Sequence, residues 1–122
     1  KAINRVEEVA VVGRGRLSEK AEAASANPSG QLRLLAERAA RLDAYRQLKQ
    51  AIRGLKLSEK QIVGDYLVAN RVSAENHPVL LRGAEESTPR WRDGGWVELT
   101  LTLPIDQVVA NVEETCRSRP SF

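Results

Sequence analysis

Hydrophobic residues recur at helical spacing through the longest uninterrupted segment of the chain, residues 31–54. This segment is built almost entirely from strong helix formers, and it contains no Pro and no interior Gly. Asn27-Pro28-Ser29-Gly30 precedes it, and Gly54 stands where a C′ glycine commonly ends a helix. The pattern therefore predicts one long helix from Gln31 to Gly54.

The predicted helix carries apolar residues on two nearly opposite sides. One side holds Leu32, Leu35, Ala39 and Leu42, and the other holds Ala44, Leu48, Ala51 and Ile52, with Leu34 and Tyr45 leaning toward the second set. A surface helix normally has a single apolar stripe, so we expect this helix to contact two layers. A sheet is expected on one side, and either another segment of the chain or a second protomer on the other.

Three further segments precede the clearest strand pattern. Residues 5–12 end in β-branched residues and predict a first strand that residues 13–17 can continue, with the glycines allowing a bend. Residues 55–69 predict a second strand, interrupted at Gly64. Residues 70–82 predict a short helix, which Pro78 either kinks or begins.

Residues 84–103 predict a β-hairpin, and apolar and polar residues alternate strictly along its second strand, residues 96–103. Its turn is Asp93-Gly94-Gly95, in which the glycines supply positive φ. The two tryptophans, Trp91 and Trp96, flank this turn. We expect them either to pack together across the hairpin or to form an exposed contact tip.

After Pro104, apolar residues return to helical spacing as far as Cys116, which predicts a terminal helix. Residues 18–30 are small and polar and predict a loop, and residues 117–122 predict a frayed tail. The element order is then β-α-β-α-β-β-α. It indicates a single α+β domain over residues 1–122, with a mainly antiparallel sheet and one long helix packed on it.

Charge adds one feature to this picture. The chain has a net charge of +3, whereas the long helix has six basic and two acidic residues, a net +4. Four of the basic residues, Arg38, Arg46, Lys49 and Arg53, project to a similar side. Such a basic strip fits an acidic ligand, a lipid headgroup or nucleic acid, or is simply a solvated face. The strip contains no base-stacking aromatic residue, which argues against nucleic acid.

Reactive groups are scarce. The chain has one Cys, one His and no Met, and Cys116 fits the apolar face of the terminal helix better than the role of a nucleophile. The glycines of residues 13–17 do not form a nucleotide-phosphate loop, because Ser18 stands where a dinucleotide fingerprint needs Gly and no Gly-Lys-Ser/Thr follows. We therefore predict no catalytic, cofactor-binding or metal-binding residues, and we predict that the protein is not an enzyme.

Three segments together resemble one family. They are ERAARLDAYRQLKQAIRGLKL (37–57), LLRGAEE (80–86) and GGWVELTLTLPI (94–105). They are similar to the bacterial envelope family of the Lpp-twenty lipoproteins, which includes the flagellar outer-membrane lipoprotein P and the N-terminal domain of flagellar assembly protein T. The chain departs from the family pattern at Asn76-His77-Pro78, within the family's short helix.

The resemblance implies an exported, non-catalytic structural or assembly module of the periplasm or outer membrane. Members of the family often assemble as oligomers or in rings around the flagellar motor, so protein partners or self-association are expected. The chain begins at Lys1, and we expect a signal peptide or a lipid anchor upstream of it. The alternative is a binding module that uses the basic strip. The candidate interaction residues are Leu32, Leu35, Leu42, Arg38, Arg46, Lys49, Arg53, Trp91 and Trp96.

Overall fold

The computed structural model describes residues 7–17, 30–70 and 78–117. Its helices and antiparallel sheet make the fold α+β, as the sequence predicts. Three predictions fall largely outside the described residues: the loop at 18–30, the part of the short helix at 71–77, and the tail at 117–122.

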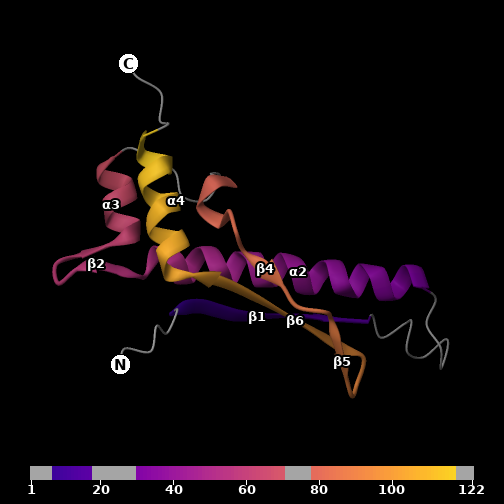
Figure 1. Cartoon of the computed structure of the whole chain (residues 1–122). Coiled ribbons are helices and arrows are strands. Elements are labelled where there is room, and N and C mark those ends of the chain that lie inside the picture. The colour runs from indigo at the N-terminus through magenta and orange to yellow at the C-terminus, as the bar shows by residue number, and fades with distance from the viewer. Residues whose placement is uncertain (1–6, 18–29, 71–77, 118–122) are drawn as a thin grey trace, which may run out of the picture. The chain divides into compact units, whose positions relative to one another are not determined.

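The larger sheet is organised around β6, the strand that the sequence pattern predicts most clearly (Figure 1). Its strand order is β1-β6-β4, and β5 also pairs with β6. The strands are β1 (Glu8–Arg16), β4 (Glu85–Glu86), β5 (Arg90–Arg92) and β6 (Trp96–Pro104). The predicted hairpin is confirmed, with Arg92 opposite Trp96 and with positive φ at Gly94 and Gly95. Its first strand is divided into β4 and β5.

The chain separates into two compact units. Unit 1 consists of Lys1–Ala10, Leu48–Glu85 and Thr102–Phe122, and unit 2 consists of Val11–Gln47 and Glu86–Leu101. The long helix, α2, is observed at Gly30–Arg53, one residue away from the predicted bounds at each end. Its residues up to Gln47 belong to unit 2 and the rest belong to unit 1.

Unit 2 is built on a close contact between β1 and α2. Along this part of β1 the glycines are buried and the arginines between them are exposed. A Cβ atom added at Gly13 would lie 2.2 Å from the backbone oxygen of Ala40, and one added at Gly15 would lie 2.1 Å from that of Ala36. Ala44 completes the buried alanine face of the helix. β1 can approach α2 so closely only because these two positions carry no side chain.

Two polar side chains of α2 satisfy the outer edge of β1. The Arg14 backbone N–H donates to Asp43 Oδ2 at 3.0 Å, and Gln47 Nε2 donates to the Val12 carbonyl at 2.8 Å. In the order β1-β6-β4, β1 is an edge strand, and unpaired edge groups are a ready template for pairing with another chain. The side chains of Asp43 and Gln47 therefore form hydrogen bonds with backbone groups of β1 that would otherwise be open to such pairing.

In unit 1, the prediction of a strand over residues 55–69 holds only for the first half of this range. The structure has two short antiparallel strands, β2 (Lys56–Ser58) and β3 (Gln61–Ile62), followed by the helix α3 (Val63–Ala69). Val63, Gly64 and Leu67 are the buried residues of α3. A short apolar run does not distinguish a strand from a buried helix by spacing alone, and here the i, i+4 pair Val63 and Leu67 follows the helical period.

The helix predicted at residues 70–82 is described only at its end, as the 3-10 helix η2 (Pro78–Leu81). Gly83 follows it with φ +88°, a conformation that favours Gly. The terminal helix α4 (Ile105–Arg117) confirms the predicted one, and it contacts both η2 and α3 (Figure 1). Buried Asn111 joins α4 to η2, because its Nδ2 donates to the carbonyls of Leu80 and Arg82.

The contact between β1 and α2 predicts a large effect of one methyl group. We expect Gly13→Ala to lower the free energy of unfolding by about 3 kcal/mol, because the new Cβ would overlap backbone atoms that cannot rotate away. Gly30→Ala is the matched control, since a Cβ at Gly30 meets no atom within 4 Å. Urea denaturation measures both, and equal stability of the two variants would contradict the proposed contact.

Candidate functional site

The first candidate surface is the side of α2 that carries the first apolar set. Leu35 is 51% exposed and Leu42 is 66% exposed, and Ala39 between them is also exposed. These three residues follow each other at intervals of four and three, so they form one stripe along the helix. We call Leu35, Ala39 and Leu42 the outer stripe. Leu32, predicted to belong to the same side, is half-buried.

The opposite apolar side of α2 is the buried one. Leu48 and Ile52 are fully buried together with Ala44, and Ala51 is half-buried. Leu34 does not follow the second set as predicted, since 64% of it is exposed. The helix therefore has one packed apolar side and one exposed apolar stripe.

The basic strip is less open than the sequence suggested. Arg46 Nη2 lies 2.6 Å from Asp43 Oδ1, one turn earlier on the same helix. Lys49 and Arg53 are half-buried, and only Arg38 and Arg46 are exposed members of the strip. Burial and ion pairing both reduce the charge that the strip offers to a ligand.

Hydrogen bonds connect several polar and charged side chains of unit 2 around α2. Arg41 Nε and the Tyr45 hydroxyl both donate to Glu86, at 3.0 Å and 2.9 Å. The bond from Arg41 lowers the pKa of Glu86, and burial together with the bond to Glu86 raises the pKa of Tyr45. These groups join α2 to the start of the hairpin and are a stabilising network.

The two tryptophans lie on opposite faces of the hairpin, so the prediction that they pack together is wrong. Trp91 is opposite Val97, and Trp96 is opposite Arg92, and neighbouring positions of a strand point to opposite faces. The Arg33 guanidinium lies over the Trp91 ring at 4.8 Å, and Trp91 Nε1 is 3.4 Å from Glu37. Trp91 therefore packs toward α2, whereas Trp96 is 40% exposed on the other face.

A group of residues around Trp96 was missed by the sequence analysis. Arg14, Arg92, Trp96 and Glu98 line an open depression of about 290 Å³. Alternation within the hairpin could have placed Arg92, Trp96 and Glu98 on one face. Arg14 joins them only because β1 pairs with β6, and the sequence does not specify that pairing.

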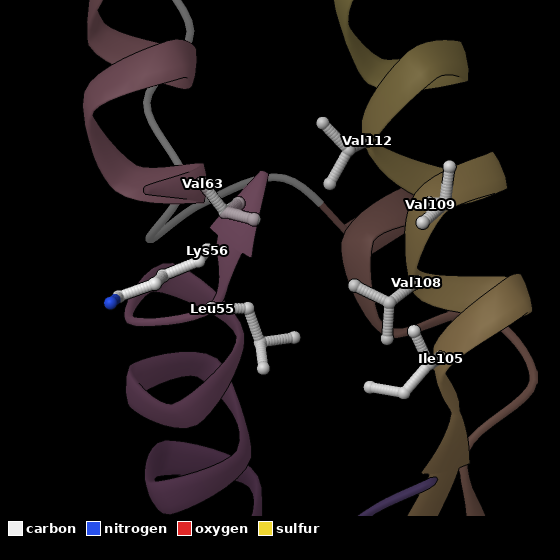
Figure 2. A pocket seen from close by; sticks show the side chains of 7 residues that line it. All are labelled: Leu55, Lys56, Val63, Ile105, Val108, Val109 and Val112. Atoms are coloured by element: carbon white, nitrogen blue, oxygen red, sulfur yellow. The ribbon is translucent and has the colours of Figure 1, made fainter. Parts of the chain in front are cut away.

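Unit 1 contains a small apolar cavity of about 70 Å³ between the end of α2 and α4 (Figure 2). Six apolar side chains and Lys56 line it, and the Lys56 amino group points away from the apolar cluster. The apolar lining residues are Leu55, Val63, Ile105, Val108, Val109 and Val112. With the Lys56 amino group pointing away, no polar side-chain group faces this apolar space to orient a ligand. We interpret it as a packing gap in the core of unit 1.

Residues 7–17, 30–70 and 78–117 contain no group of three or more His, Cys, Asp or Glu side chains placed to hold a metal ion. Within the same residues, no helix combines the length and the apolar character that crossing a membrane requires.

Comparison with known proteins gives no relative. No family model matches the sequence, and neither the curated proteins nor the solved structures include a significant match.

The contacts of Asp43 predict a pH-dependent stability. The hydrogen bond from the Arg14 backbone, and then that from Arg46, hold the pKa of Asp43 below its ordinary value of 3.8. A carboxyl group whose pKa is lower in the folded state stabilises the fold above the unfolded pKa, and this stabilisation is lost as the pH falls through the folded pKa. We expect Asp43→Asn to cost about 1 to 2 kcal/mol at pH 7.

The same difference should shrink between pH 7 and pH 2.5, because protonation of the wild-type carboxyl weakens the bonds that it accepts as the pH falls below 3.8. Urea denaturation at the two pH values measures this change. Asp93→Asn, at an exposed position in the hairpin turn, is the control for losing one negative charge. A cost for Asp43→Asn that stays constant between pH 7 and pH 2.5 would contradict the assigned role of the carboxylate.

Proposed function

We propose that this protein is a non-catalytic assembly module of the bacterial cell envelope and that the outer stripe of α2 is its docking face. The observation that carries the proposal is the exposure of Leu35 and Leu42 on a helix whose opposite side is firmly packed. Isolated exposed apolar residues are common on protein surfaces. Two leucines separated by two helical turns, with Ala39 between them, instead form a continuous contact surface.

The geometry of α2 suits a docking role. Its opposite side is fixed by the alanine contacts to β1 and by Asp43 and Gln47 at the strand edge. A rigid helix presents its leucines in one arrangement, so a partner pays little entropy to order them. An amphipathic helix laid against another helix, with anchors at i, i+4 and i+7, is a common recognition mode.

The assignment to the envelope rests on the resemblance to the Lpp-twenty family in residues 37–57, 80–86 and 94–105. A flagellar ring or a lipoprotein component is the narrower form of the proposal, with protein partners or self-association in the periplasm or at the outer membrane. Fold and sequence resemblance do not by themselves determine function, so the docking face and the location are tested together.

The test incorporates a photo-crosslinking amino acid at position 42 of the protein, which is expressed in the bacterium that it comes from. We expect a covalent adduct that fractionates with the envelope, and we expect Leu35→Glu on the same chain to reduce its yield at least fivefold. The reduction follows because a buried interfacial charge without a partner is strongly unfavourable. The mass of the adduct distinguishes a second copy of this chain from another protein.

Position 68 provides the matched control, since Val68 is 70% exposed but lies on α3 in unit 1. Adducts of equal yield at positions 42 and 68 would contradict the docking face. An adduct found only in the cytosolic fraction would contradict the envelope assignment. Normal flagella and motility after deletion of the gene would contradict the flagellar form of the proposal.

A further inference from the structure

The face of the hairpin that carries Trp96 has an unusual concentration of arginines. Arg14 and Arg16 on β1 are exposed, and so are Arg90 and Arg92 on β5. On β1, Arg14 and Arg16 alternate with Gly13 and Gly15. The glycines face α2, so the arginines lie on the opposite face of the strand. The open depression of about 290 Å³ lies on this face.

A single carboxylate holds two of these guanidinium groups in place. Arg14 Nε lies 3.1 Å from Glu98 Oε2, and Arg92 Nε lies 3.0 Å from Glu98 Oε1. Glu98 is thus a bridge between β1 and β5, and these two bonds use only the Nε atom of each guanidinium. The terminal NH₂ groups of Arg14 and Arg92 are not used in either bond. The bonds from Arg92 and Arg14 also lower the pKa of Glu98, so it stays ionised near neutral pH.

Trp96 forms the aromatic wall of the depression. The Arg16 guanidinium lies over its ring at 5.3 Å, which is within the range of a cation–π contact. Counting Arg14 and Arg92 against Glu98, the charged residues that line the depression carry a net charge of +1. Surface ion pairs alone contribute little to stability. Two guanidinium groups held by one carboxylate beside a concave, partly apolar surface are instead a suitable site for an anion.

We propose that this depression binds a phosphate monoester carried on a planar ring, with the phosphate at Arg14 and Arg92 and the ring against Trp96. A phosphate monoester carries a charge of about −1.5 to −2 at pH 7 and has three strong acceptor oxygens. That charge is opposite in sign to the net charge of the lining residues, and guanidinium groups bind phosphate through paired N–H donors. The volume, about 290 Å³, is just below the usual range for small-molecule pockets, which begins at about 300 Å³.

Phenyl phosphate is the probe that combines the two features, and inorganic phosphate carries the anion alone. Titration followed by NMR of the ¹⁵N-labelled chain at 50 mM salt should show phenyl phosphate binding at least fivefold more tightly than inorganic phosphate, since aromatic stacking adds affinity. The shifts should centre on the Trp96 indole and on Arg92. Trp96→Leu should bring phenyl phosphate to the level of inorganic phosphate.

Arg92→Gln should weaken phenyl phosphate binding about tenfold, because a hydrogen bond to a charged group is lost. The matched control is Arg90→Gln, which removes the same charge from the same strand, outside the residues that line the depression. It should change the affinity less than twofold. Arg14→Gln is the second test. The backbone N–H at position 14 can still donate its hydrogen bond to Asp43 in this variant, so the fold is expected to be preserved.

Several results would overturn the proposal. Equal weakening by Arg92→Gln and Arg90→Gln would show a diffuse charge effect. Equal affinity for phenyl phosphate and inorganic phosphate would remove the role of Trp96, and no shift at 20 mM phenyl phosphate would remove the site. An oligothymidylate that binds far more tightly, with shifts extending to Arg90, would assign the face to single-stranded nucleic acid instead.

Discussion

The absence of side chains at two positions of β1 governs the rest of unit 2. Gly13 and Gly15 let β1 approach α2 until only the alanine face of the helix separates their backbones. Because β1 and α2 are so close, Asp43 and Gln47 reach the outer edge of the strand and satisfy its backbone groups. The glycine motif that fails as a phosphate loop thus has a structural role, which is close packing between a strand and a helix.

This contact also determines what remains exposed. The alternation of β1 turns Arg14 and Arg16 away from the helix, where Arg14 meets Glu98 and Arg16 meets Trp96. On α2, the alanine side is used for packing, and the outer stripe is left in solvent. The two surfaces that carry the functional proposals are therefore the remaining sides of the same packed pair of elements.

Strong periodicity was a reliable guide to structure. The long helix, the hairpin with its turn and the terminal helix all form where the pattern predicts them. The strand predicted over residues 55–69 is wrong from Val63 onward, because a short apolar run fits both periods and burial of Val63 and Leu67 in unit 1 selects the helix. The predicted packing of the two tryptophans is wrong because the hairpin register decides which residues share a face. Arg92 is opposite Trp96, so Arg92 shares the face of Trp96 and its neighbour Trp91 lies on the other face. Predicting the depression around Trp96 would have required knowing that β1 pairs with β6, and no local sequence pattern contains this information.

Hydrogen exchange at the Arg14 amide tests the docking of β1 on α2 most directly. This amide points to the outer edge of the strand, and its acceptor is the Asp43 carboxylate rather than another strand. If β1 is held against α2 as described, the Arg14 amide should exchange slowly, at a rate close to that of global unfolding measured for the core of α2. Exchange within seconds at pH 7, with α2 still protected, would show that β1 is not docked and would contradict the account.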